Sequence, residues 1–350
     1  ERFCFPPFPE PHVHSMDGAL APLRATGSDG KDWTAALARV DAAQAAPFTL
    51  EEEQYAGHAK PWFVELEFER QAILRTPKLR LALTGWFYWS DSTANVASAG
   101  AGLAFIPPTL EIPDGRGGWK AAGPPVGFPS GKTKTMVIDV TGILSRDDPR
   151  IRVSTTLRLY WDAILLAVDG DDAPREEREL APSSARLWRR GFSAPLPASG
   201  LGRRDDPRSE VFDWEHTIES ARWNQTPGMY TRYGDCTELV LEVDDRYAMI
   251  GAGDALTLRF DAREIAQPRE GYVRDWILHL DGWCKDADLN TVAAESIEPL
   301  PFHAMSAYPY PANERFPDDE AHARWRREWN TRSAYRWILP VSPTREVDWL

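Results

Sequence analysis

Four segments in the first half of the chain alternate apolar and polar side chains with a period of two, and this alternation constrains the fold more than any other feature of the sequence. The segments are residues 62–69, 78–89, 133–140 and 150–168, which are rich in β-branched and aromatic side chains. A period of two is typical of strands with one buried face. Because these strands follow one another without helices between them, they predict an antiparallel β-sandwich.

A short sequence motif from this region, which we call the Gly-Trp phrase, occurs a second time near the C-terminal end of the chain. Further strand signals lie at residues 237–243 and 254–261, so a strand-like segment precedes each copy of the phrase. The repeat predicts that residues 62–86 and 254–283 are equivalent strand pairs in two related sandwiches. The matching residues are Leu81, Leu83, Gly85, Trp86 and Asp91 in the first copy and Leu278, Leu280, Gly282, Trp283 and Asp288 in the second.

The predicted fold class is therefore all-β, with two tandem antiparallel β-sandwiches of the galactose-binding-like or jelly-roll type. A length of 350 residues agrees with two domains at about 150 residues each. We expect an irregular N-terminal segment with a short helix at residues 1–60 and a first sandwich at 61–180. A second sandwich with a helical tail is expected at 181–350, after a polar, proline-containing linker at residues 170–184.

Two helices are expected outside the sandwiches. The first covers residues 33–46, where an alanine-rich stretch follows Asp32 as the N-cap. The second belongs to the C-terminal tail. It begins near Pro317, because a proline followed by three acidic residues suits the N-terminus of a helix.

The chain is acidic, with a net charge of −13 and a pI of about 5.1. Binding to nucleic acid requires clustered Lys and Arg side chains that neutralise phosphates, so the charge argues against a nucleic-acid partner and against an anionic membrane surface. No stretch approaches the roughly 18 apolar residues of a membrane span, so we expect no membrane insertion. The chain begins at Glu1 without a signal peptide, which indicates a processed mature protein or a fragment of a longer one.

Three cysteines, Cys4, Cys236 and Cys284, leave the redox state open. An odd count without a Cys-x-x-Cys pair excludes a zinc ribbon, a thioredoxin motif and c-type haem attachment. One disulfide between two of the three, or three buried free thiols, both agree with the sequence.

The first half of the chain resembles a known group of sandwich domains. Asp114, Gly115 and Trp119 fit a DG-x-x-W hairpin, and residues 150–153 fit the strand that follows it. With the strand order of residues 60–168, these features resemble galactose-binding or discoidin-type sandwiches. Trp119, at the end of the hairpin, is a candidate binding residue.

The whole chain resembles a second group. The phrases GMYTRYGD, LDGWCKDADLNT and EPLPFHAMSAYPYP look like the C-terminal region of large bacterial secreted proteins that carry FG-GAP β-propeller repeats and ASPIC/UnbV-type segments, as in relatives of cartilage acidic protein. The resemblance implies an extracytoplasmic location, periplasmic or secreted, and a propeller ahead of this chain. No D-x-D-x-D-G calcium repeat of such a propeller lies in the sequence, and the resemblance brings no activity with it.

Trp86 and Trp283 are candidate binding residues, because each follows a glycine at the end of a predicted strand. An aromatic ring at a sandwich rim can stack on a sugar or a cation. The alternative is a structural tryptophan, with Gly85 and Gly282 permitting the backbone a close approach.

Asp286, Asp288 and Asn290 form the candidate metal site. Oxygen ligands at alternate positions begin many calcium loops, so calcium is the one cofactor that the sequence suggests. The loop lacks the glycine at its sixth position and the glutamate at its twelfth, and a solvated polar turn is the alternative. The first copy of the repeat keeps only Asp91 and Asn95.

No motif in the sequence joins a nucleophile to a base, completes a metal site or forms a cofactor loop. We therefore expect a non-catalytic binding or scaffold module of an extracytoplasmic protein or assembly, which contacts protein or carbohydrate. One alternative is a glycan hydrolase, since two distant carboxylates would leave no motif. The other is a permanent structural subunit of a larger complex, since long irregular segments stay ordered only when contacts hold them.

Overall fold

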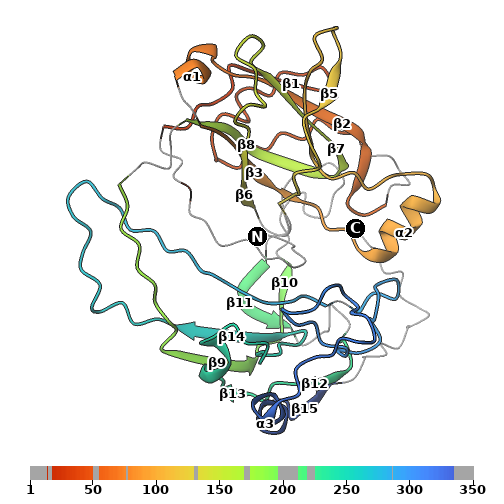
Figure 1. The fold of residues 1–350 in the computed structure, drawn as a ribbon, viewed down its shortest axis with the longest axis vertical. Helices are drawn as coiled ribbons and strands as arrows, with labels where there is room; N and C mark the ends of the chain where they lie inside the picture. The colour runs from red at the N-terminus through yellow and green to blue at the C-terminus, as the bar shows by residue number, and fades with distance from the viewer. Residues whose placement is uncertain are drawn as a thin grey trace. The chain divides into compact units, whose positions relative to one another are not determined.

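The structure is a computed structural model. The chain folds into two compact units. Among the described residues, those up to 175 belong to the first unit and those from 176 onward to the second (Figure 1). All strand pairings between these residues are antiparallel, and helices are few. The prediction of a β-rich fold with antiparallel sheets is confirmed. The described residues are 14, 18–49, 55–75, 78–129, 133–168, 174–195, 212–218, 225–285 and 287–334.

A five-stranded sheet in the first unit has the strand order β1-β2-β7-β4-β5. Alternate residues such as Val64 and Leu66 of β2 and Val153 of β7 are buried on one face, and the intervening charged residues lie on the other. The sheet is therefore amphipathic, as the alternation predicts. Its strands are β1 (Arg24–Gly27), β2 (His58–Glu67), β7 (Arg150–Leu157), β4 (Thr109–Pro113) and β5 (Trp119–Ala121).

A three-stranded sheet, in the order β6-β3-β8, completes the core of the first unit. Leu81 and Leu83 of β3 and Trp161 of β8 are fully buried, and they share one apolar core with the inner face of the five-stranded sheet. Two short helices, α1 (Arg70–Arg75) and α2 (Ser92–Gly100), accompany the sheets. The strands are β6 (Lys134–Asp139), β3 (Leu79–Phe87) and β8 (Leu159–Val168).

The helix predicted over residues 33–46 is absent, and that prediction is wrong. The stretch forms turns, and Ala38 and Ala45 make isolated bridges to β8. The Asp162 carboxylate accepts hydrogen bonds from two backbone N–H groups of the stretch, at 2.7 and 3.2 Å. Pairing with a buried strand outweighs the helix propensity of alanine here. Strand β1 also falls within the N-terminal segment that was expected to be irregular.

The second unit combines short strands with long irregular segments. Strand β9 lies between β13 and β14, and β10–β11 and β12–β15 form separate pairs. Residues 237–243 were predicted as a strand, but they begin with the 3-10 helix η2 (Thr237–Val240). The strands are β9 (Ser184–Arg189), β10 (Phe192–Pro195), β11 (Phe212–Ile218), β12 (Gly228–Tyr230), β13 (Gly234–Asp235), β14 (Asp254–Arg259) and β15 (Arg332–Ala334).

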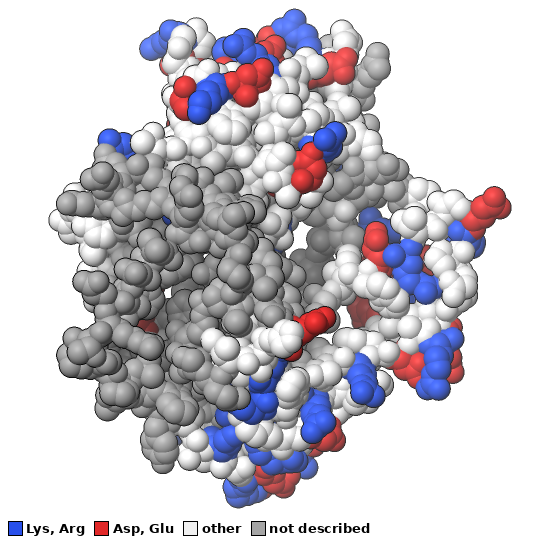
Figure 2. Space-filling view, turned by 180° about the vertical axis from the view of Figure 1, so that it is seen from behind, with Lys and Arg blue, Asp and Glu red and all other residues white. Residues whose placement is uncertain are grey.

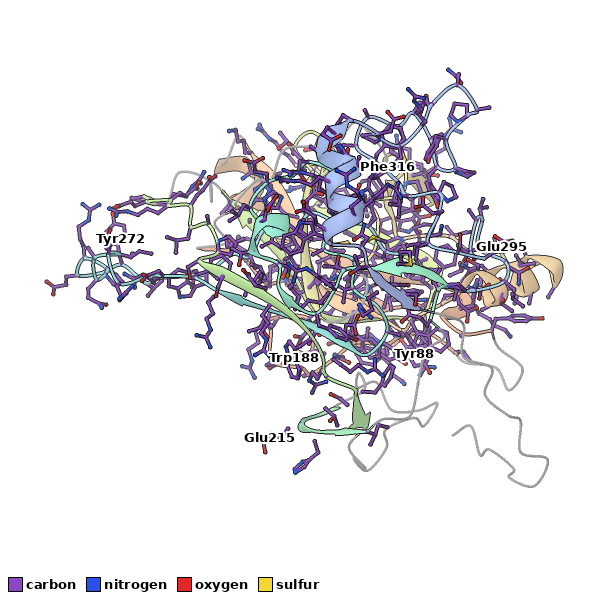
Figure 3. The ribbon with its side chains drawn as sticks, turned by 90° about the horizontal axis from the view of Figure 1, so that it is seen from below. Tyr88, Trp188, Glu215, Tyr272, Glu295 and Phe316 are labelled. Atoms are coloured by element: carbon purple, nitrogen blue, oxygen red, sulfur yellow. The ribbon has the colours of Figure 1, made fainter. Side chains whose placement is uncertain are left out.

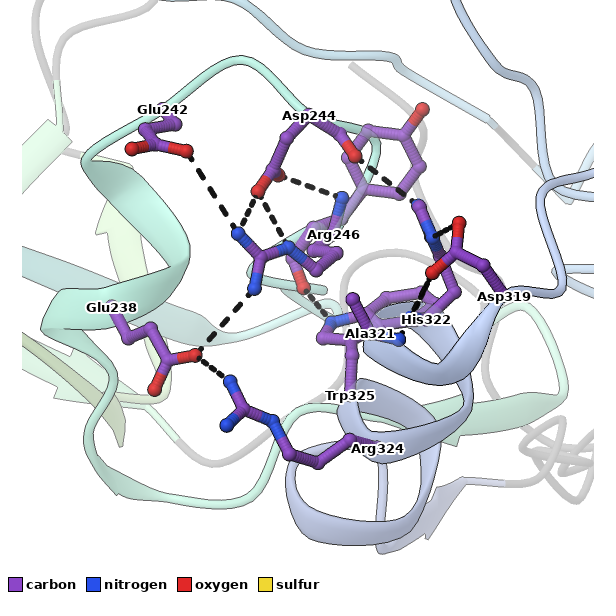
Figure 4. Close-up of polar contacts among 10 residues, drawn as sticks. Glu238, Glu242, Asp244, Arg246, Asp319, Ala321, His322, Arg324 and Trp325 are labelled. Atoms are coloured by element: carbon purple, nitrogen blue, oxygen red, sulfur yellow. Dashed lines mark hydrogen bonds and ion pairs between the residues drawn. The ribbon is translucent and has the colours of Figure 1, made fainter.

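Helix α3 (Glu320–Glu328) confirms the predicted C-terminal helix and lies at the core of the second unit. The Asp319 side chain caps it by accepting hydrogen bonds from two backbone N–H groups of the first turn, at 2.9 and 3.1 Å. Trp325 is buried and donates its Nε1 hydrogen bond to the backbone oxygen of Tyr247 at 3.0 Å. One ion pair, from Arg324 to Glu238 of η2, also joins the helix to the rest of the unit (Figure 4).

The second copy of the Gly-Trp phrase is not a strand, so the predicted equivalence of residues 62–86 and 254–283 is wrong. Strand β14 forms at the start of the second range, but residues 273–283 form no helix or strand. Leu83 of the first copy is fully buried, whereas the matching Leu280 is 72% exposed. The two copies share a sequence phrase without sharing a place in a sheet.

The structure also bears on the expectations about charge, membrane insertion and the state of the cysteines. Acidic and basic side chains intermingle on the face shown in Figure 2. In the described ranges, no helix is both long enough and apolar enough to cross a membrane. Cys236 is a buried free thiol and Cys284 an exposed one, while Cys4 lies outside the described residues.

Candidate functional site

The hairpin of β4 and β5 is shaped by the side chain of Asp114. Its Oδ1 accepts hydrogen bonds from the backbone N–H groups of Arg116 at 2.7 Å and Gly118 at 2.9 Å. These bonds favour the ionised carboxyl and hold the pKa of Asp114 below its usual value. The turn sets Trp119 opposite Pro113, so a hairpin forms at the predicted place, with three residues rather than two between Gly115 and Trp119.

Trp119 lies on the outward face of the five-stranded sheet, near a row of charged residues. The register pairs Glu65 of β2 with Arg152 of β7, and Arg152 with Glu111 of β4. Arg152 Nη2 lies 3.2 Å from the Glu65 carboxylate, and Arg152 Nη1 lies 4.0 Å from that of Glu111. One guanidinium is therefore held between carboxylates from two neighbouring strands.

The Arg152 guanidinium also lies over two aromatic rings. Its Cζ is 3.8 Å from the ring centroid of Phe63 and 4.1 Å from that of Trp119. The Cζ of Arg150 lies 5.5 Å from the Trp119 ring. Both distances from Arg152 are within the range of cation–π attraction. We call this set the arginine–aromatic face: Phe63, Glu65, Glu111, Trp119, Arg150 and Arg152.

Arg150 is fixed in turn by Asp148. Its Nε and Nη2 each lie 2.7 Å from one oxygen of that carboxylate, which is a bidentate pair. The hydrogen bonds from Arg150 lower the pKa of Asp148, and Asp148 raises the pKa of Arg150. Both groups are therefore ionised at neutral pH, and Arg150 contributes a positive charge to the face.

The arginine–aromatic face offers N–H donors, carboxylate acceptors and aromatic rings within one patch. Its cations are matched by carboxylates, so the patch carries little net charge. Such a surface suits an uncharged ligand rich in hydroxyl groups. The hydroxyls can accept from guanidinium groups and donate to carboxylates, while apolar ligand faces contact the aromatic rings. Sequence reasoning found Trp119 through its hairpin and missed the other five residues of the face.

Trp86 is the second-last residue of β3, close to the strand end that the sequence predicts, and it is only 4% exposed. Its ring stacks on Tyr160 with centroids 4.4 Å apart and 13° between the ring planes. Gly85 admits this packing, because a Cβ there would lie 2.4 Å from the backbone oxygen of Tyr160. The packing corresponds to the structural interpretation of this tryptophan. Ligand binding by Trp86 stays a prediction, and the arginine–aromatic face does not include it.

Trp283 packs beside a histidine that two carboxylates hold. The Trp283 and His303 rings form an edge-to-face contact with centroids 6.0 Å apart. His303 Nδ1 lies 2.6 Å from Asp245 Oδ1, and Nε2 lies 3.1 Å from Asp281 Oδ1. Burial opposes the charged ring, but the two carboxylates outweigh it and raise the pKa of His303. The cluster clamps two loops together, and ligand binding by Trp283 stays a prediction.

Of the three predicted calcium ligands, Asp286 lies outside the described residues. Asp288 Oδ1 accepts a hydrogen bond from the backbone N–H of Asn290 at 2.8 Å, and its backbone oxygen accepts one from Thr291 at 3.0 Å. These bonds make a polar turn. In the part of the chain that the structure describes, no three His, Cys, Asp or Glu side chains are grouped to hold a metal ion. Calcium binding at this loop stays a prediction.

Comparisons with models of known protein families, with curated proteins and with solved structures found no match to this chain. The function proposed below therefore starts from the geometry of the described residues.

Proposed function

We propose that the chain is a non-catalytic binding module and that its arginine–aromatic face binds an uncharged carbohydrate. The arrangement of Arg152 carries this proposal, because its guanidinium is held by Glu65 and Glu111 and lies over the rings of Phe63 and Trp119. A side chain that is already fixed loses little conformational freedom on binding, which favours affinity. The matched charges of the face and the net charge of −13 favour a neutral glycan over an acidic one.

Binding to a panel of immobilised neutral and acidic polysaccharides tests this proposal. We expect at least one neutral glycan to bind, and Trp119→Ala to weaken binding by about 30-fold or more, as for an aromatic residue at the centre of an interface. Trp188→Ala is the matched control, because Trp188 lies on β9 in the second unit and is partly exposed. If Trp119→Ala is folded and binds the glycan as tightly as the wild type does, the proposed site is refuted.

Glycan hydrolysis is a second candidate function, because Asp245 and Asp281 converge on His303. Glycosidases need two carboxylates near the scissile bond, one of them able to donate a proton. We expect glycans to bind without release of reducing sugar. Sugar release that Asp281→Asn abolishes, without loss of glycan binding, would establish the hydrolase instead.

An extracytoplasmic location fits this role, because extracellular glycans are accessible there. The resemblance of the sequence to C-terminal regions of secreted FG-GAP proteins supports this part of the proposal. A scaffold role, or a permanent place in a larger complex, would require a partner interface above about 2,000 Å². Fractionation of cells that produce the tagged chain tests the location, and we expect it in the periplasm or the medium rather than the cytoplasm.

A further inference from the structure

The sheet formed by β13, β9 and β14 in the second unit has one buried face and one exposed face. Ala185 and Leu187 of β9 belong to the apolar core, whereas Arg186 and Trp188 are exposed. In the view of Figure 3, Trp188 lies on the side of β9 away from α3. Because side chains alternate along a strand, Arg186 and Trp188 share the outer face of this sheet.

The strand register brings residues of β14 onto the same outer face. Thr257 lies directly opposite Arg186, and Arg259, two residues further along β14, lies opposite Ser184. Residues that face each other in this way share one side of the sheet. Trp188 Nε1 also donates a hydrogen bond to Thr257 Oγ1 at 3.0 Å, which ties the ring to the face. We call this set the arginine–tryptophan face: Arg186, Trp188, Thr257 and Arg259.

The two arginines of this face are not neutralised by carboxylates. Among the described residues, neither Arg186 nor Arg259 makes an ion pair or a side-chain hydrogen bond. Asp235 of β13 lies opposite Arg186, but its Oδ1 accepts hydrogen bonds from the backbone N–H and the hydroxyl of Thr237, at 3.0 and 2.5 Å. The face therefore carries an excess of positive charge. It differs in this from the arginine–aromatic face, whose arginines are held by carboxylates.

The spacing of the two arginines fits an extended acidic chain. Arg186 and Arg259 are diagonal neighbours on an antiparallel strand pair, and such residues lie about 7–8 Å apart. In an extended peptide, every second side chain points to the same side, about 7 Å from the last. Acidic residues at positions i and i+2 of a peptide can therefore reach both guanidinium groups. Trp188 offers an aromatic surface to a neighbouring side chain of the same peptide.

We propose that the arginine–tryptophan face binds an extended acidic segment of a partner protein. Charge complementarity selects this partner, and arginine and tryptophan are the residue types that most often carry the binding energy of protein interfaces. The chain as a whole has a net charge of −13, so its overall charge does not attract such a segment and recognition depends on this face. The proposal is independent of the glycan site, which lies in the first unit.

Fluorescence anisotropy of a labelled peptide of alternating Glu and Thr, titrated with the 350-residue chain, tests the proposal. We expect binding that weakens as salt is added, because salt screens exposed charges. Arg186→Glu and Arg259→Glu should each weaken it by about tenfold or more, since each sets like charges against one another. Arg116→Glu, at an exposed position of the first unit, makes the same change in net charge and is the matched control. An absence of binding, or binding that neither substitution on the face weakens, would overturn the proposal.

A reversal of charge separates loss of recognition from loss of folding. The double variant Arg186→Glu, Arg259→Glu should bind a peptide of alternating Lys and Thr more tightly than the wild type does, a gain that a misfolded chain would not show. Arg116→Glu with Arg146→Glu, in the first unit, is the control for net charge. An equal gain in both double variants would count against the face.

The two tryptophans distinguish this proposal from the glycan site. Trp188→Ala should weaken binding of the Glu–Thr peptide and leave binding of a neutral glycan unchanged, whereas Trp119→Ala should do the reverse. Dextran sulfate serves as a second anionic probe. If it binds at this face while the Glu–Thr peptide does not, the occupant is an acidic polysaccharide and the proposal of a protein partner is overturned.

Discussion

Gly85 lies where β3 meets β8 too closely for any larger residue. A Cβ at this position would lie 2.4 Å from the Tyr160 backbone oxygen and 2.8 Å from the Trp161 ring. Gly282, at the same place in the second copy of the phrase, has no such neighbour within 4 Å. One glycine is therefore required by packing and the other is not.

We expect Gly85→Ala to lower the free energy of unfolding by about 1–3 kcal/mol, because the methyl group must displace backbone. Gly282→Ala is the matched control and should change it by less than about 0.5 kcal/mol. Urea unfolding of the two variants and the wild type measures both changes. Similar losses in the two variants would contradict the difference in packing described for the two copies.

His303 gives the second unit a stability that depends on pH. Its pKa in the folded chain is raised above the usual value, so its contribution is fully present below about pH 6.5 and is lost as pH rises through the folded pKa. We expect His303→Gln to cost about 1.5–3 kcal/mol in mildly acidic buffer, the range for charge-assisted hydrogen bonds, and much less in alkaline buffer. His216→Gln, at an exposed position, is the control. A cost for His303→Gln that is the same at both pH values would contradict the clamp.

The sequence identified Trp119 as a candidate binding residue but not Arg152. The reason is that the alternation of apolar and polar residues gives only part of the information that a site requires. A period of two tells which residues of one strand share a face. It does not tell which strands are neighbours, and the Glu65–Arg152–Glu111 row forms only because β7 lies between β2 and β4. The DG-x-x-W hairpin is local, so its residues could be placed from sequence alone.

At the scale of the element, local capping signals separate the helices that were predicted from those that were not. Helix α3 has its N-cap at Asp319 and acidic residues around its start, and it was predicted. Helix α2 begins at a cap as well, since Asp91 accepts a hydrogen bond from the Ala94 N–H at 2.6 Å. It was missed because it continues directly from a strand phrase. Residues 33–46 have the composition of a helix, but pairing with β8 decides their conformation.

The cap of α3 can be tested directly. Asp319→Ala removes the acceptor for two backbone N–H groups and should cost about 0.5–2 kcal/mol of unfolding free energy. Asp319→Ser keeps an acceptor at the cap and should recover most of this loss. Asp318→Ala, at the preceding exposed position, is the control and should have little effect. Thermal and urea unfolding measure the series, and a cost for Asp318→Ala equal to that of Asp319→Ala would argue against capping.

At the scale of the whole molecule, the two units differ in how strongly the sequence specifies them. The first has a core built by alternating residues on long strands, and the period-two segments predicted those strands. The second has a core of irregular segments around α3, where aromatic residues such as Phe302, Phe316 and Trp325 pack without a repeating pattern. Contacts between residues far apart in sequence decide such a core, and no local signal reports them.

The central claim is that the arginine–aromatic face is a glycan-binding site. Hydrogen–deuterium exchange of the wild-type chain, with and without a neutral oligosaccharide from the polysaccharide that binds, tests it most directly. We expect slower exchange in residues 109–121 and 148–154, which carry β4, β5 and the start of β7, and unchanged exchange in β9 and β14 of the second unit. Protection confined to the second unit, with residues 109–121 unaffected by a bound glycan, would contradict the account.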